Sequence, residues 1–196
     1  MNAHAPSPRL ADHPIDPIFL NRHSPRAFTE ATLIEADLLA LLEAARWAPS
    51  ASNNQPWRFA YGLRGDAGFA KIADTLVPFN RAWAEKASAL VVIASKSTVE
   101  KDGVANPNPW AAFDAGAAWM SLALQAYLKG LFAHAMGGFD KAKATDLLGV
   151  PADYTLHAVV AIGTQGAADT LPEGLRAREV HSPRHPLSEI AKHGSF

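Results

Sequence analysis

The segment from Trp110 to Lys129 restricts the possible folds of this chain more than any other segment. Its residues are apolar around nearly the whole circumference of a helix, and the small residues at 115–118 would let a second helix approach closely. The uncharged run between Asp114 and Lys129 is shorter than the roughly 20 residues that a membrane-spanning helix needs. The pattern therefore predicts a long helix that is buried inside the domain or at a subunit interface.

Length and composition predict one globular domain. The chain has 196 residues, and its hydrophobic fraction of 48% is enough for one sizeable core. Its 18 basic and 19 acidic residues leave a net charge of −1, which gives no broad field that would favour nucleic acid or an anionic membrane. The absence of cysteine excludes disulfides, thiol nucleophiles and cysteine-based metal sites, and it is compatible with a reducing compartment. We expect a cytoplasmic protein.

The two ends of the chain differ in composition from its middle. Residues 1–14 are rich in Pro, Ala and Ser and lack the apolar run of a secretory signal, so we expect a mobile N-terminal lead-in. Residues 15–196 are expected to form a single domain. Its polar, proline-rich end, residues 180–196, is expected to form an arm that lies over the surface.

Hydrophobic periodicity predicts helices that alternate with strands. Spacings of three and four residues, with Asp or Pro at the first turn, predict helices at 17–20, 34–47, 65–76, from 78 onward, 110–129 and 140–148. Short alternating or continuous apolar runs predict strands at 57–61, 89–94 and 155–163. The turn residues at 106–109 predict a mobile surface loop. Taken alone, this order of elements favours a parallel α/β sheet.

The segment Trp47–Phe59, WAPSASNNQPWRF, carries an unusual row of neutral polar side chains between two prolines. These hydroxyl and amide groups both donate and accept hydrogen bonds, and they belong to Ser50, Ser52, Asn53, Asn54 and Gln55. A flat heteroaromatic ring with alternating donor and acceptor edges would match such a row. The alternative interpretation is a polar turn that is capped by its own Ser and Asn side chains.

Two further clusters contain residues suited to a ligand. Arg22 and Arg26 stand four residues apart with Ser24 between them, so their guanidinium groups could hold a phosphate, although a solvated basic turn is the alternative. Gly137-Gly138 marks backbone that adopts unusual angles or comes close to something flat. Together with the neutral polar row, these clusters suit a phosphorylated aromatic cofactor.

Other chemistries lack their sequence motifs. The chain has no GxGxxG after a strand, no P-loop, no HExxH and no GxSxG. Its eight histidines are scattered without the spacing of metal ligands, so we expect no metal site.

Five motifs together resemble the FMN-dependent nitroreductase family. They are RHSPRAF, WAPSASNNQPWRF, PFNRAW, MGGFD and Arg184-x-Pro186, in this order, and the resemblance spans roughly residues 17–190. It implies an α+β fold in which helices flank a central, mainly antiparallel sheet. It also implies an intertwined homodimer with two FMN molecules at the subunit interface.

The resemblance also implies which residues contact FMN. The phosphate and ribityl chain would be held by Arg22, Ser24, Arg26 and Arg184, with His23 beside them. The second subunit would line the flavin with Pro49, Ser50 and Asn53, and Gln55 would support that loop. Asn80 would bond the pyrimidine edge of the ring. Met136, Gly137 and Gly138 would pass its other face and edge, with the Gly137 N–H near flavin N5. Ala135 departs from the family pattern, because many relatives have proline there.

The implied activity is the reduction of nitroaromatic or quinone-type acceptors by NADH or NADPH. Hydride would pass through flavin N5 in ping-pong fashion, and because the flavin carries the chemistry we expect no obligatory catalytic acid or base. Two other functions stay open: a flavoenzyme of the same fold with other chemistry, such as dehalogenation or flavin fragmentation, and a non-catalytic flavin-binding or storage protein. An interaction module without a cofactor is disfavoured by the clustered arginines.

Overall fold

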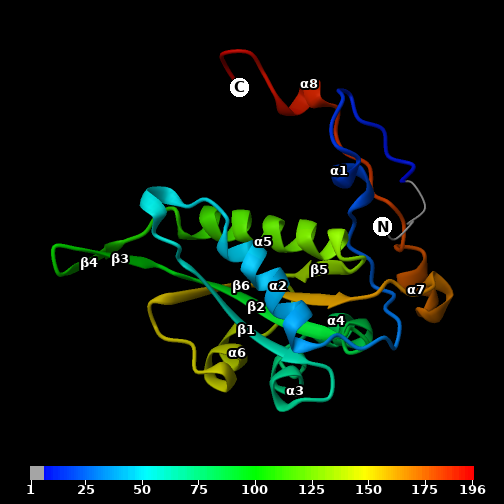
Figure 1. Cartoon of the computed structure of the whole chain (residues 1–196), viewed down its shortest axis with the longest axis horizontal. Coiled ribbons are helices and arrows are strands. Elements are labelled where there is room, and N and C mark those ends of the chain that lie inside the picture. The colour runs from blue at the N-terminus through cyan, green and yellow to red at the C-terminus, as the bar shows by residue number, and fades with distance from the viewer. Residues whose placement is uncertain (1–6) are drawn as a thin grey trace.

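The computed structural model describes residues 7–196. The first six residues of the lead-in predicted for 1–14 therefore lie outside the described part of the chain. Short helices and the 3-10 turns η1 and η2 surround four long strands and one long helix (Figure 1).

The helices are α1 (Pro17–Asn21), α2 (Glu35–Arg46), α3 (Ala67–Ala73), α4 (Pro78–Ala84), α5 (Ala111–Leu128), α6 (Lys141–Leu148), α7 (Glu173–Arg176) and α8 (Leu187–Ile190), with η1 (Ala51–Asn53) and η2 (Ala168–Thr170). Helices α1 to α6 correspond to the predicted ones, whereas the short helices α7 and α8 lie where none was predicted. The strands are β1 (Trp57–Leu63), β2 (Ala89–Lys96), β3 (Thr98–Lys101), β4 (Val104–Pro107), β5 (Phe132–Met136) and β6 (Tyr154–Gly163). Asp16, Asp66 and Asp140 cap α1, α3 and α6 by accepting a backbone N–H from inside the helix.

The central sheet is antiparallel throughout, in the order β1-β2-β6-β5. This confirms the α+β fold with an antiparallel sheet, and the parallel sheet favoured by the element order alone is wrong. The reason lies in the connections. Helices α3 and α4 return the chain to the end of the sheet at which β1 finished, so Leu63 pairs with Ala89 and β2 runs back beside β1.

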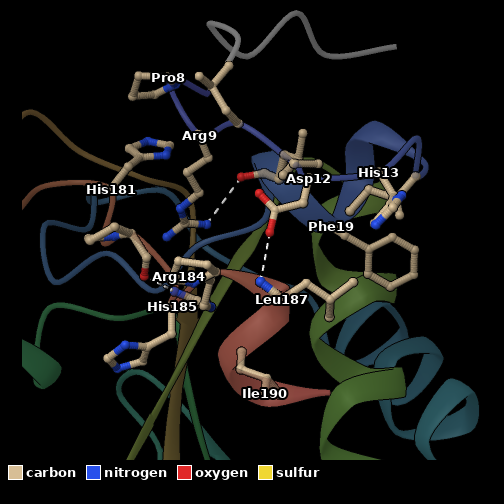
Figure 2. Close-up of a pocket in the computed structure, with 16 residues that line it drawn as sticks. Pro8, Arg9, Asp12, His13, Phe19, His181, Arg184, His185, Leu187 and Ile190 are labelled. Atoms are coloured by element: carbon tan, nitrogen blue, oxygen red, sulfur yellow. Dashed lines mark hydrogen bonds between the residues drawn. The ribbon is translucent and has the colours of Figure 1, made fainter. Parts of the chain in front are cut away.

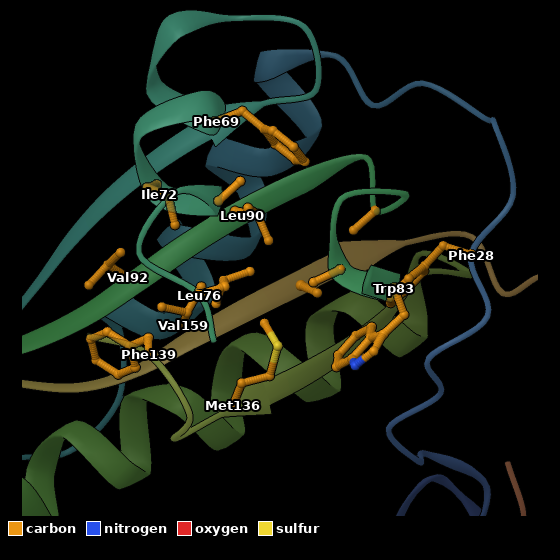
Figure 3. Packing of buried hydrophobic residues seen from close by; sticks show 14 of the residues in the cluster. Phe28, Phe69, Ile72, Leu76, Trp83, Leu90, Val92, Met136, Phe139 and Val159 are labelled. Carbon is orange, nitrogen blue, oxygen red and sulfur yellow. The ribbon is translucent and has the colours of Figure 1, made fainter. Parts of the chain in front are cut away.

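Helices cover both faces of this sheet. In β2, Leu90 and Val92 belong to the core cluster under α3, α4 and α6, whereas Val91 and Ile93 belong to the cluster under α2 and α5. Figure 3 shows the first cluster, in which Trp83 of α4 and Met136 of β5 pack near Phe28. The bulge between Ile93 and Ala94 then resets this alternation in the neighbouring strand β6.

The structure contains two strand pairings that the sequence analysis missed. Strands β3 and β4 form a hairpin in place of the predicted surface loop, and its turn is Asp102-Gly103 with φ values of 54° and 75°. Asp-Gly with two positive φ angles is the pattern of a tight hairpin turn. Strand β5 was missed because His134 interrupts a short apolar run.

Helix α5 buries only one of its sides within the chain. Ala118 and Leu122 lie in the core, but Phe113 is 75% exposed and Leu128 is 69% exposed. The long apolar helix is thus confirmed, and it leaves an uncovered apolar surface along its length.

Gly62 of β1 lies against the backbone of α3. A Cβ at this position would lie 1.9 Å from the Phe69 backbone N and 2.4 Å from the Gly68 carbonyl carbon. Because backbone cannot yield as a flexible side chain does, we expect Gly62→Ala to lower the free energy of unfolding by about 3 kcal/mol in urea denaturation. Gly174→Ala is the control, since its Cβ would meet nothing within 4 Å. An unchanged urea midpoint for Gly62→Ala would contradict this packing.

Candidate functional site

The segment 22–28 follows α1 and is held from several sides. Asp16 Oδ1 accepts the Ile18 N–H at 2.8 Å and starts α1, which ends where the Arg22 N–H reaches the Ile18 carbonyl at 2.9 Å. The buried Pro25 accepts a hydrogen bond from His134 Nδ1 at 3.0 Å. This chain segment is therefore fixed against β5.

Arg22 lies in a cluster of three guanidinium groups that come from distant parts of the chain. Arg9 donates from Nη1 to the Arg22 carbonyl at 2.9 Å and from Nε to the Ser182 carbonyl at 2.9 Å. Burial, and then the positive charges of Arg9 and Arg184, lower the pKa of Arg22. Within residues 7–196, no carboxylate lies within 4.0 Å of any of these three guanidinium groups. The cluster is an uncompensated positive site.

The N-terminal segment and the C-terminal arm hold each other away from the sheet (Figure 1). Figure 2 shows them on two sides of a cavity of about 620 Å³, across which Asp12 Oδ2 accepts the Leu187 N–H at 2.7 Å. Phe19 and Ile190 contribute exposed apolar side chains to its lining. The arm carrying Arg184 is thus tied to the lead-in rather than to the core.

Arg26 differs from Arg22 in having a carboxylate beside it. Its Nη1 lies 3.9 Å from Glu179 Oε2, and its guanidinium carbon lies 6.0 Å from the centre of the Trp83 ring. The charge of Arg26 is therefore balanced within the chain. The solvated basic turn that the sequence left open does not form. Both arginine side chains are partly buried, and they donate hydrogen bonds to Ser24 Oγ and to the Arg178 carbonyl.

His23 lies between aromatic rings beside this cluster. Its ring centre is 4.1 Å from that of His181 and 4.9 Å from that of Phe132. Burial is the main cause of its lowered pKa. Ser24 Oγ accepts from Arg22 Nη1 at 3.5 Å, so these neighbours share one surface.

Asn80 and Gly138 meet at the start of α4. Asn80 Nδ2 donates to the Gly138 carbonyl at 2.9 Å, and a Cβ at Gly138 would lie 2.7 Å from that same nitrogen. The expectation of unusual backbone angles is wrong, since neither Gly137 nor Gly138 has a positive φ. The absent side chain at Gly138 instead leaves room for the close approach of the Asn80 amide. Met136 is buried in the core, whereas Gly137 is exposed.

The polar row after Pro49 forms a tight exposed loop with strained backbone. Ser52, Asn53 and Gln55 have φ values of 50°, 55° and 47°, a region that costs energy for residues other than glycine. Part of the row stabilises its own turn, because Ser50 Oγ accepts the Gln55 N–H at 3.0 Å and Gln55 Nε2 donates to the Asn53 carbonyl at 3.1 Å. The Asn53 side chain remains exposed.

A buried carboxylate holds this loop against α5. Asp114 is only 3% exposed, and both of its oxygens lie 3.3 Å from the Ala51 backbone N. Beside it lies an open cavity of about 300 Å³ with apolar walls, lined by Pro49, Ser50, Ala51, Trp110, Phe113, Asp114 and Ala117.

The structure separates the residues implied by the resemblance into two groups. The first group comprises Arg22, His23, Ser24, Arg26, Asn80, Met136, Gly137, Gly138 and Arg184. Its members Arg22 and His23 lie beside the end of α5 that leads into β5, where His23 contacts Phe132, and Asn80 and Gly138 meet at the other end of that strand. The second lies at the beginning of α5 and comprises Pro49, Ser50, Asn53 and Gln55. The 18 residues of α5 place these ends about 27 Å apart.

Comparison with known proteins assigns the chain to a family. A sequence model described as the nitroreductase family matches residues 20–76 and 63–164. The chain belongs to the nitroreductase family.

Relatives of this nitroreductase-family chain include proteins of bacteria and archaea. It is 35% identical over 138 residues to an uncharacterized 15.4 kDa protein of Mycolicibacterium smegmatis, covering 67% of this chain and 90% of that protein. It is 28% identical over 146 residues to an Archaeoglobus fulgidus protein provisionally named NADH dehydrogenase/NAD(P)H nitroreductase, covering 72% and 80%. A solved structure described as an oxidoreductase containing FMN superimposes with a TM-score of 0.94, 43% identity and 96% coverage of each chain.

The described residues contain neither a metal-binding cluster nor a membrane-spanning helix. Between residues 7 and 196, no cluster of three or more His, Cys, Asp or Glu side chains is arranged to hold a metal ion. Over the same residues, no helix combines the length and apolarity that crossing a membrane requires.

Sequence reasoning did not find three residues that organise the candidate site. Arg9 stands in a proline-rich lead-in, and Glu179 stands in a polar segment, so neither belongs to a recognisable motif. Asp114 begins the apolar run of α5, and a carboxylate at that position was a detectable signal, because a carboxylate buried with such a run requires donors.

His134 makes the stability of this nitroreductase-family protein depend on pH. Burial, the largest influence, lowers the pKa of His134 from its ordinary value of 6.5. The unfolded chain then binds the proton more readily than the folded chain. The contribution of neutral His134 to the free energy of unfolding is therefore complete above pH 6.5 and is lost as the pH falls below that value. We expect His134→Asn to flatten this decline in urea denaturation at about pH 7.5 and about pH 5.5. His193→Asn, at an exposed position, is the control, and equal slopes for both variants would contradict the assignment.

Proposed function

We propose that this protein is an FMN-dependent oxidoreductase that takes electrons from NADH or NADPH and reduces nitroaromatic or quinone-type acceptors. The observation that carries the proposal is the cluster of Arg9, Arg22 and Arg184, which has no carboxylate nearby in the described chain. Three guanidinium groups that repel one another are stabilised by a dianionic phosphate, to which they also donate charge-assisted hydrogen bonds. The relative described as an FMN-containing oxidoreductase supports the same cofactor.

The remaining residues fit the flavin ring of FMN. Asn80 has one amide hydrogen engaged with the Gly138 carbonyl, and its other donor and its acceptor can serve the pyrimidine edge. Gly137 is exposed and carries no side chain, so its N–H can approach the ring closely. The loop with Ser50 and Asn53 offers neutral polar groups, which suit an uncharged ring system better than ionic ones.

Each site needs two subunits, because the phosphate group of residues and the loop lie at opposite ends of α5. A two-fold axis perpendicular to α5 would bring the beginning of one helix beside the end of the other. The exposed apolar side of α5, with Phe113 and Leu128, would then be covered by the second copy. The lead-in and the arm, which stand away from the sheet in Figure 1, would wrap around that copy. These features support an intertwined homodimer.

In the proposed reaction, FMN supplies the redox chemistry and the protein supplies binding and orientation. FMN, when bound, supplies reversible two-electron chemistry, accepting hydride from the nicotinamide and giving it to the acceptor in alternate half-reactions. The chain's own residues bind and orient: the arginines hold the phosphate, and Asn80 fixes the ring edge. Once covered by the second subunit, the apolar walls near Trp110 and Phe113 would exclude water and offer flat surfaces to an aromatic acceptor. No side chain needs to exchange a proton with the acceptor.

The visible spectrum tests the proposed function directly. Purified protein, or protein incubated with FMN and desalted, should show flavin absorbance bands that bleach anaerobically on addition of NADH or NADPH and return when a quinone is added. Initial rates at several quinone concentrations should give parallel double-reciprocal lines, as expected for ping-pong kinetics. Bands that persist with both nicotinamides would favour the flavin-binding or storage protein, and failure to take up FMN would overturn the proposal.

Complementation between subunits tests the shared site. Arg22→Ala should remove a phosphate contact and Asn53→Ala a contact of the opposite loop, so each homodimer should lose most FMN and activity. In a mixed dimer one site carries both substitutions and the other carries neither. Random mixing should therefore restore roughly a quarter of wild-type activity, since about half of the dimers are hybrids with one intact site. Activity of the co-expressed mixture that does not exceed that of the separate variants would argue for a site within one subunit.

A further inference from the structure

Glu179 lies where the body of the protein ends and the C-terminal arm begins. Its side chain is only 5% exposed, and its Oε1 accepts the backbone N–H groups of Arg26 at 2.7 Å and Ala27 at 2.9 Å. One carboxylate oxygen thus takes two consecutive backbone donors of the segment that begins at Arg22. Because buried backbone donors need partners, this oxygen specifies the conformation of the segment.

The other oxygen of Glu179 belongs to a buried polar cluster. Oε2 lies 3.9 Å from Arg26 Nη1, and Arg26 in turn faces the Trp83 ring. Among residues 7–196, the buried side-chain atoms without a hydrogen-bond partner are Glu179 Oε2, Arg26 Nε and Trp83 Nε1. A bound water molecule could accept from the two N–H donors, Arg26 Nε and Trp83 Nε1, and donate to the Glu179 oxygen.

The neighbouring residue extends the connection to the helix of Asn80. Arg178 accepts from Arg26 Nη1 through its carbonyl at 3.4 Å, and its guanidinium carbon lies 5.8 Å from the centre of the Phe79 ring. Residues 178–179 therefore contact both the segment 22–27 and α4. They stand just before the arm, with Glu179 five residues ahead of Arg184.

We propose that Glu179 is a positioning residue: it holds the segment 22–27 so that Arg22 and Ser24 face the cofactor phosphate. In this role Glu179 would act through the segment rather than through contact with FMN, and this inference rests on the proposed function. A positioning role of this kind affects the phosphate end of the ligand and leaves the ring end unaffected. FMN and riboflavin differ only in that phosphate, so they separate the two ends.

The test compares the dissociation constants of FMN and riboflavin, measured with the apoprotein by quenching of flavin fluorescence. Glu179→Ala should raise the dissociation constant of FMN by about tenfold or more, because two backbone donors lose their acceptor. The dissociation constant of riboflavin should change by less than about threefold. Glu179→Gln keeps an amide oxygen for these donors, and its FMN affinity should stay within about threefold of wild type. Glu30→Ala is the matched control, since the exposed Glu30 lies a few residues beyond this segment and pairs with Arg64 at 3.6 Å.

Three results would overturn the positioning role. They are an equal decrease of FMN and riboflavin affinity in Glu179→Ala, an unchanged FMN affinity in Glu179→Ala, or the same decrease of FMN affinity in Glu30→Ala. Amide hydrogen exchange gives a readout without flavin, because the Arg26 and Ala27 N–H groups should lose protection in Glu179→Ala and keep most of it in Glu179→Gln. If wild-type protein binds no FMN, the proposed function fails. Exchange then decides alone whether Glu179 holds the segment, and unchanged protection in Glu179→Ala would overturn that as well.

Discussion

The burial of both faces of the β2–β6 pair determines most of this structure. Every residue of β2 from Ala89 to Ser95 is buried, and β6 is buried from Val159 to Gly163. A strand pair without a solvent-facing side requires helices on both faces. Helices α2 and α5 cover one face and α3, α4 and α6 cover the other (Figure 1). Candidate binding residues are consequently confined to the ends of these elements and to the loops that join them.

The excess of apolar surface on α5 connects the fold to the proposed site. This helix has more apolar residues than the sheet and α2 can cover, so Phe113, Leu128 and the small residue Gly116 remain exposed. Contiguous exposed apolar surface of this kind is typical of a protein interface. The same helix separates the arginine cluster from the loop at Ser50 by its length. On the proposed function, this one helix would account both for the need for a second subunit and for the division of the site between subunits.

The sequence predicted the elements whose pattern is set by local burial. The helices at 34–47 and 110–129 and the central strands at 89–94 and 155–163 were found because their periodicity follows from the faces that they bury. The resemblance, rather than any pattern, supplied the antiparallel sheet. The hairpin at β3–β4 was missed although Asp102-Gly103 is a strong turn signal, because the prolines that follow it favour an irregular loop.

The division of the site residues could not be predicted from periodicity, because it depends on contacts between distant segments. RHSPRAF suggests that Arg22 and Arg26 act alike, yet Glu179, 153 residues from Arg26, balances one of them and leaves the other without a carboxylate. The glycine pair gives a second case. Its sequence suggests either unusual backbone angles or a close approach to something flat, whereas the positive φ angles of non-glycine residues here lie in Ser52, Asn53 and Gln55, which no glycine marks. Left-handed backbone at non-glycine residues persists only when its surroundings hold it, here through Ser50 Oγ and Asp114.

The uncompensated arginines connect cofactor binding with the order of the arm. Arg9, Arg22 and Arg184 come from the lead-in, the end of α1 and the arm, and their mutual repulsion opposes the approach of these three segments. Hydrogen bonds from Arg9 to the Leu20, Arg22 and Ser182 carbonyls hold the segments together against that repulsion. A bound phosphate would replace repulsion by attraction at the same place. By linkage, a ligand that binds the closed arrangement more tightly must also stabilise it. On the proposed function, occupancy of the phosphate site and closure of the arm are therefore one equilibrium, and the arm is most ordered in the protein that carries FMN.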